Sequence, residues 1–93
     1  MVQCPAVRDD VLVPNLSERH KKHPSLVAFG ETVRKLRLER GLSQEALAMS
    51  AEIDRSYMGG IERGESNITL MSMLRLAEAL EVRASEILRL AKL

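Results

Sequence analysis

Apolar residues recur at helical spacing from about residue 23 to the end of the chain. A first helix is predicted to begin at His23-Pro24, because proline is well tolerated in the first turn. It is predicted to end at Gly41, a residue that suits the left-handed backbone after a helix. Its apolar stripe steps by three and four, as one face of an α-helix requires: Leu26, Phe29, Val33 and Leu36.

Two short helices joined by a tight turn are predicted between residues 44 and 63. Ser43 and Asp54 stand where a side-chain oxygen would cap each of them. One helix covers about residues 44–50, and the next runs to about residue 63 before Gly64 ends it. Apolar residues fall where a folded pair of helices needs buried contacts: Leu47, Ala48, Ile53, Met58 and Ile61.

A fourth helix is predicted after a cap at Thr69, and a fifth over residues 84–92 with Ile87 and Leu88 inward. The apolar stripe of the fourth comprises Leu70, Met73, Leu74, Ala77 and Leu80. Five helices with connections of two to six residues predict an all-α, five-helix bundle.

Residues 1–22 show little periodicity and carry Pro5 and Pro14, so an N-terminal arm is predicted outside a helical domain of residues 23–93. The arm is interpreted either as a disordered tail or as a segment that packs on a second subunit or another protein partner. A third possibility is that it reaches DNA with its basic residues, Arg19, Lys21 and Lys22.

The outward side of the helix over residues 55–63 is short, polar and ends in an arginine. On a helical projection it carries Ser56, Gly59, Gly60 and Arg63. Such a face suits the major groove of DNA, which admits one α-helix. Two glycines inside a helix cost together about 2 kcal/mol relative to alanine. Either they allow close approach to DNA, or Gly59 makes room for a neighbouring helix. On the first interpretation, Gly60→Leu leaves folding intact and abolishes DNA binding.

Composition supports a helical core in a chain of 93 residues, since it holds one Phe, one Tyr and no Trp. The methionines are interpreted as flexible core filling: Met49, Met58, Met71 and Met73. Cys4 is alone, and His20 and His23 lack a third ligand, so neither a disulfide nor a metal site is expected. No membrane span, signal peptide, cofactor motif or catalytic set is present, so a cytoplasmic protein that is not an enzyme is expected.

The net charge of +1 means that any phosphate affinity must come from local placement of basic residues. One basic cluster lies near the end of the first helix: Arg34, Lys35, Arg37 and Arg40. It is open whether this cluster is a solvated helix end or a phosphate-contacting surface.

Three segments together resemble the phage-repressor (Cro/repressor-type) helix-turn-helix family over about residues 26–90: RGLSQEALA, IERGESN and LRLAEALEV. The resemblance implies a lambda-repressor-like helix-turn-helix domain that binds double-stranded DNA. The segment IDRSYMGGIERG is also similar to the controller proteins of restriction–modification systems.

The resemblance also implies roles for individual residues. Gln44 matches a phosphate-contacting position, and Gly60 matches a base-facing one. Three further residues match positions that enter the major groove: Arg55, Ser56 and Tyr57. The residues that surround a phosphate-approaching loop are Arg63, Ser66, Asn67 and Thr69. Glu52 stands where the family often has glycine; if that position is left-handed, it costs roughly 1 kcal/mol.

Arg55 is the strongest candidate for base contact, because a guanidinium donates two bonds to guanine O6 and N7. Its alternative is an ion pair with Asp54 or Glu52. The expected function is a homodimeric transcriptional regulator on a palindromic operator, with a dimer surface formed by Met71, Leu90 and Leu93. The alternative is an antitoxin-like or other protein-interaction module with secondary DNA binding.

Overall fold

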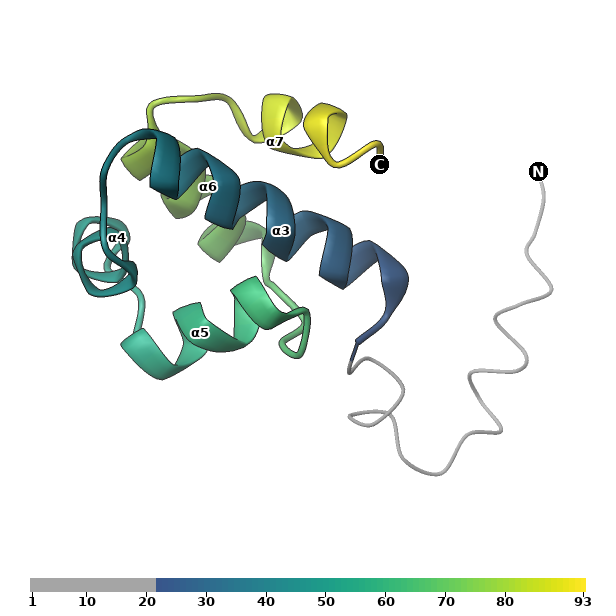
Figure 1. Cartoon of the computed structure of the whole chain (residues 1–93), viewed down its shortest axis with the longest axis horizontal. Helices are drawn as coiled ribbons and strands as arrows, with labels where there is room; N and C mark the ends of the chain where they lie inside the picture. The colour runs from purple at the N-terminus through teal and green to yellow at the C-terminus, as the bar shows by residue number, and fades with distance from the viewer. Residues whose placement is uncertain (1–21) are drawn as a thin grey trace, which may run out of the picture.

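The computed structural model describes residues 22–93, which contain five helices. These are α3 (Pro24–Glu39), α4 (Gln44–Ala51), α5 (Arg55–Arg63), α6 (Leu70–Leu80) and α7 (Ala84–Leu90), shown in Figure 1. Within that range all regular structure is helical, which confirms the predicted all-α fold. No helix there is long and apolar enough to cross a bilayer. The predicted arm, residues 1–22, lies outside the described part except for Lys22 at its end.

The long helix α3 lies between α7 on one side and α5 on the other, with α6 behind it and α4 at one end (Figure 1). Each helix supplies at least one fully buried apolar side chain to a single core: Val33, Leu47, Met58, Leu76 and Ile87. Full burial of a side chain of this size stabilises a fold by about 1.5–3 kcal/mol. The core therefore holds all five helices in one body.

The predicted helix caps are all present. Ser43 Oγ accepts a hydrogen bond from the backbone N–H of Ala46 at 3.0 Å, at the start of α4. Asp54 Oδ2 accepts from the N–H groups of Ser56 and Tyr57 at 2.9 and 3.3 Å, at the start of α5. Thr69 Oγ1 caps α6 through the N–H of Ser72 at 3.1 Å. Each such cap contributes about 1 kcal/mol and fixes where its helix begins.

Gly30 allows a close approach between α3 and α5. A Cβ atom at Gly30 would collide with the carbonyl oxygens of Ile61 and Glu62, so the backbones of α3 and α5 are in direct contact. Only glycine fits such an approach. The sequence pattern offered Gly59 for contact with a neighbouring helix, whereas the backbone contact between helices lies at Gly30.

The predicted apolar stripe of α6 is partly wrong. The residues that α6 buries are Ser72, Leu76, Ala77 and Leu80, whereas Leu70 is 66% and Leu74 is 44% exposed. Ser72, Leu76 and Leu80 are four residues apart, so they form one row of the helix, and this row faces the core. An apolar side of α6 is thereby left in solvent.

Two of the four methionines do not fill the core as predicted. Met58 is fully buried and Met73 is half-buried, but Met49 is 76% and Met71 is 56% exposed. Met49 lies on the outer side of α4, because Leu47 and Ala48 occupy its inner side. Met71 joins Leu70 and Leu74 on the exposed side of α6.

Candidate nucleic-acid interface

The turn between α4 and α5 requires a left-handed residue, and Glu52 supplies it at φ 57° and ψ 46°. The condition stated above for Glu52 is therefore met: the position is left-handed, and a non-glycine residue there lowers the stability of the fold by roughly 1 kcal/mol. After the turn, the N–H of Ile53 donates to the carbonyl oxygen of Ala48 at 2.8 Å. The Ile53 side chain then enters the core, so α4 and α5 form a helix-turn-helix unit.

A buried polar network links α3, α4 and α5. The Arg37 guanidinium donates to both carboxylate oxygens of Glu62, at 2.7 and 3.0 Å, and to the carbonyl oxygen of Leu42 at 2.9 Å. Gln44 Nε2 donates to the same Glu62 carboxylate at 3.0 Å. The Arg37 and Glu62 side chains are only 9% and 2% exposed. Since a low-dielectric interior penalises unpaired charge, these bonds hold the three helices in one relative position.

Neither interpretation of the basic cluster holds for Arg37. This residue is neither solvated nor free for phosphate, because its guanidinium is used inside the domain. The sequence carried a signal that Arg37 is buried, because Arg37 lies four residues after Val33, on the inward row of α3. Glu62 likewise lies four residues after Met58, on the inward row of α5. The remaining cluster members are exposed: Arg34, Lys35 and Arg40.

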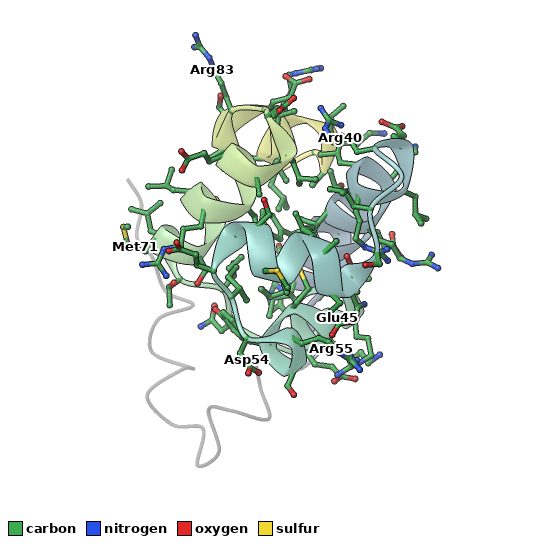
Figure 2. All side chains as sticks on the ribbon, turned by 90° about the vertical axis from the view of Figure 1, so that its left-hand side faces the viewer. Arg40, Glu45, Asp54, Arg55, Met71 and Arg83 are labelled. Atoms are coloured by element: carbon green, nitrogen blue, oxygen red, sulfur yellow. The ribbon has the colours of Figure 1, made fainter. Side chains whose placement is uncertain are left out.

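Arg55 and Ser56 are exposed at the start of α5. Figure 2 shows Arg55 and Asp54 at the lower edge of the domain, while Arg40 and Arg83 lie toward the opposite edge. Within residues 22–93 the Arg55 guanidinium makes no ion pair or hydrogen bond, so the alternative pairing with Asp54 or Glu52 is absent there. The Asp54 carboxylate is occupied by capping α5. The guanidinium is therefore available to a ligand.

Tyr57 is half-buried and joins α5 to the loop before α6. Its hydroxyl accepts a hydrogen bond from the N–H of Thr69 at 3.3 Å and donates to the carbonyl oxygen of Asn67 at 3.5 Å. Asn67 and Thr69 are exposed. The Thr69 hydroxyl is already used, because it caps α6 and also donates to Ser72 Oγ at 3.0 Å. Tyr57 thus fixes this loop beside α5.

The prediction that Gly60 faces outward is wrong. Gly60 is buried, and a Cβ atom there would overlap Ser66 Oγ. The chain reverses at Gly64, with φ 75°, and the N–H groups of Glu65 and Ser66 donate to the carbonyl oxygen of Gly60 at 2.8 and 3.3 Å. Gly60 therefore accommodates a loop of its own chain, and a leucine at this position would have to displace Ser66.

Gly59 is also buried, but under side chains of the candidate site. A Cβ atom there would lie 2.9 Å from Arg63 Nη1 and 3.5 Å from Gln44 Oε1. Gln44 belongs to α4, so Gly59 makes room for a side chain of a neighbouring helix, although no backbone of that helix lies so close. Arg63 Nε donates to Glu65 Oε1 at 3.1 Å. The C-terminal half of α5 thus brings together Gln44, Gly59 and Arg63. Ser66 covers the adjacent Gly60.

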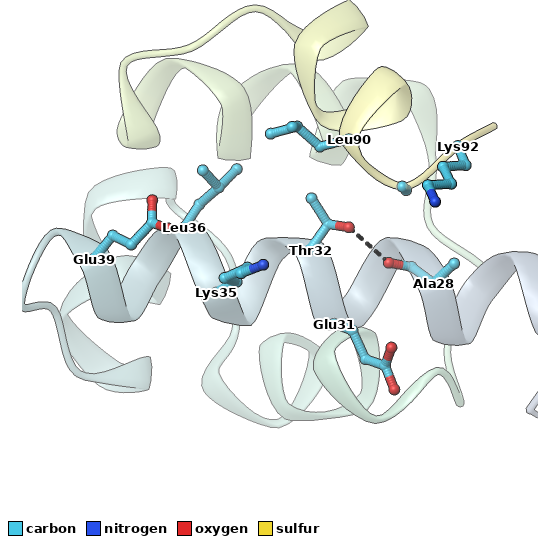
Figure 3. Close-up of a pocket in the computed structure, with 9 residues that line it drawn as sticks. Ala28, Glu31, Thr32, Lys35, Leu36, Glu39, Leu90 and Lys92 are labelled. Atoms are coloured by element: carbon cyan, nitrogen blue, oxygen red, sulfur yellow. Dashed lines mark hydrogen bonds between the residues drawn. The ribbon is translucent and has the colours of Figure 1, made fainter.

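A groove of about 500 Å³ between α3 and α7 lies on the other side of α3 from α5 (Figures 1 and 3). Figure 3 shows charged side chains of both signs along it, with Leu90 and Lys92 facing α3. The hydroxyl of Thr32 inside the groove donates to the carbonyl oxygen of Ala28 at 2.9 Å. Across the described residues, no three His, Cys, Asp or Glu side chains are grouped to hold a metal. The outward side of α5 remains the best candidate for a ligand surface.

Comparison with known proteins agrees with this geometry. A helix-turn-helix family model matches residues 33–87. The control protein C.BamHI of Bacillus amyloliquefaciens is 38% identical over 61 residues, which span 64% of this chain and 75% of the relative. The immunity repressor of Bacillus phage phi105 is 37% identical over 61 residues, 66% of this chain and 42% of the repressor. The crystal structure of the restriction-modification controller protein C.AhdI from Aeromonas hydrophila has a TM-score of 0.69 at 48% identity, covering 70% of this chain and 98% of that one.

Proposed function

Because the chain belongs to the Cro/repressor-type helix-turn-helix family of transcriptional regulators, we propose that it binds a specific DNA sequence as a homodimer. In each half-site α5 lies in the major groove. The observation that carries this proposal is the exposed start of α5, where Arg55 and Ser56 project from the domain and the Arg55 guanidinium has no partner among the described residues. The buried network behind α5 gives that surface a fixed position.

Arg55 supplies the base readout by donating to O6 and N7 of a guanine, which is worth about 1–3 kcal/mol of discrimination. Ser56 adds a weaker contact, because a hydroxyl prefers no single base. The other residues position the helix on phosphate and sugar: Gln44, Tyr57, Arg63, Ser66 and Asn67. Thr69 orders the loop beside them, because its N–H and its hydroxyl both donate within the chain. Gly60 has no part in the interface, since Ser66 covers it.

Substitution of Arg55 tests the base readout. Arg55→Ala is expected to lower the preference for the selected guanine by about 1–3 kcal/mol while non-specific affinity changes little. Arg83→Ala is the matched control, because Arg83 is also exposed but lies toward the opposite edge in Figure 2. Affinities for the selected site and for single-base variants are compared by fluorescence anisotropy. Equal base preference in the Arg55→Ala and wild-type chains would contradict the proposal.

The apolar side of α6 forms the dimer surface, together with Leu90 and Leu93 near the C-terminus. Leu70, Met71 and Leu74 are 66%, 56% and 44% exposed, and Leu90 and Leu93 are 44% and 54% exposed. Apolar side chains gathered on one helix in this way mark contact with another chain. One helix reads only a few base pairs, whereas a two-fold dimer reads two half-sites about one DNA turn apart.

Analytical ultracentrifugation with paired variants tests the dimer. Leu70→Glu is expected to give a monomer at tens of micromolar, because it places a charge in the proposed contact. Met49→Glu changes an even more exposed apolar residue on α4 and is expected to leave the dimer intact. A monomeric wild-type chain would contradict the proposal, and so would an identical response of the two variants.

A further inference from the structure

The guanidinium of Arg63 lies against the backbone of α5 at Gly59, four residues earlier in the same helix. A Cβ atom at Gly59 would stand 2.9 Å from Arg63 Nη1 and 3.7 Å from Arg63 Cζ. Residues four apart share one side of a helix, so Arg63 is folded back along α5. Its side chain nevertheless remains 58% exposed and can reach a ligand.

One neighbour holds the guanidinium in this place, and the Gln44 side chain lies close to the same point. Arg63 Nε donates to Glu65 Oε1 at 3.1 Å, in the loop that follows α5. Gln44 Oε1 lies 3.5 Å from the position that a Gly59 Cβ would take. The Gln44 amide is itself oriented, because Nε2 donates to the buried Glu62 carboxylate at 3.0 Å. A cation from α5 and an amide from α4 therefore both lie near Gly59, which has no side chain.

We propose that Gly59 is a positioning residue, which seats the Arg63 guanidinium beside Gln44 so that the two bind one backbone phosphate of the DNA. This inference rests on the proposed function. The guanidinium offers several donors in a planar fork that fits phosphate oxygens. The backbone N–H of Gln44, the first residue of α4, adds a donor that has no partner inside the helix.

The substitution Gly59→Ala distinguishes a positioning role of Gly59 from a purely structural one. Only the movable end of Arg63 comes within 3.0 Å of the added Cβ, so the helix itself accepts alanine. Alanine is also the better helix former. Gly59→Ala is therefore expected to keep or raise the thermal midpoint while it displaces the guanidinium.

The readout is the salt dependence of operator binding by the dimeric full chain. Gly59→Ala removes one phosphate contact from each subunit, so the slope of log K against log salt becomes shallower by about 1.8. Affinity at 0.15 M salt falls roughly 30-fold, with base preference unchanged. Arg63→Ala gives the same change, and the double variant Gly59→Ala/Arg63→Ala gives no further loss.

Other outcomes would overturn the inference. An unchanged slope in Gly59→Ala excludes the positioning role. A further loss in the double variant, beyond Arg63→Ala alone, means that the methyl group itself obstructs DNA. If Gly59→Ala fails to fold, then more than the movable end of Arg63 must shift for the methyl group, and the inference is wrong. If Arg55→Ala loses base preference while Gly59→Ala binds normally, only this inference fails; a wild-type chain that binds no duplex refutes both it and the proposed function.

Discussion

The ion pair between Arg37 and Glu62 allows a sharp prediction about stability. Arg37→Met keeps an unbranched side chain of similar length on α3 but removes every donor of the guanidinium. The Glu62 carboxylate, whose side chain is 2% exposed, then keeps only the hydrogen bond from Gln44. The carbonyl oxygen of Leu42 loses its side-chain donor as well.

The size of the expected stability loss follows from the Glu62 carboxylate, which stays buried without its partner. Breaking a buried ion pair by removing one partner destabilises a protein by about 3–5 kcal/mol, because the remaining charge is uncompensated. Small domains have a total stability of about 5–15 kcal/mol, so a large part is lost. In a domain of 60–100 residues, about 1 kcal/mol corresponds to roughly 4–8 °C, so the midpoint should fall by at least about 12 °C.

Thermal and urea unfolding followed by circular dichroism, at fixed protein concentration, measure the loss. Arg89→Met is the matched control: Arg89 donates to Glu86 and lowers the pKa of that carboxyl group, but both side chains are well exposed. Exposed pairs contribute little, so this variant should unfold close to the wild type. The double variant Arg37→Met/Glu62→Met should recover much of the loss, since apolar residues replace buried pairs well. A loss below about 1 kcal/mol in Arg37→Met would refute the reasoning.

Three further substitutions test the local geometry by the same unfolding measurements. Glu52→Gly should stabilise the chain by up to about 1 kcal/mol by relieving the left-handed backbone, and a loss of stability would contradict that origin. Gly60→Ala should destabilise the chain despite the better helix propensity of alanine, because the methyl group meets Ser66 Oγ. Adding Ser66→Gly should recover part of the lost stability, and no recovery would exclude contact with Ser66 as the cause. Ser43→Ala should cost about 1 kcal/mol through the lost cap of α4, whereas an unchanged midpoint would show that the cap contributes nothing.

Local features of this chain were readable from its sequence. The caps at Ser43, Asp54 and Thr69 depend on neighbouring residues and their backbone, so a single sequence predicts them. The left-handed backbone at Glu52 was raised only as a condition, by the resemblance to a family that often has glycine there. The ends of the helices followed from the same signals. The resemblance over three segments added the family, which the matched region of residues 33–87 confirms.

Contacts between residues far apart in the sequence could not be predicted in the same way. Arg37 and Glu62 are 25 residues apart, and nothing local to either shows that they pair. The helical projection of α5 assumed one covered side, but the loop after Gly64 returns to cover Gly60 as well. The DNA contacts of α5 and its loop stay predictions, because they depend on a partner outside the chain.

Selection of bound duplexes from a random DNA pool tests the central claim most directly. The proposed homodimer with α5 in the major groove should enrich an inverted repeat whose half-sites are centred about 10 base pairs apart. Each half-site should carry a guanine whose enrichment disappears in the Arg55→Ala chain. Absence of enrichment, or an enriched guanine that persists without Arg55, would contradict the account.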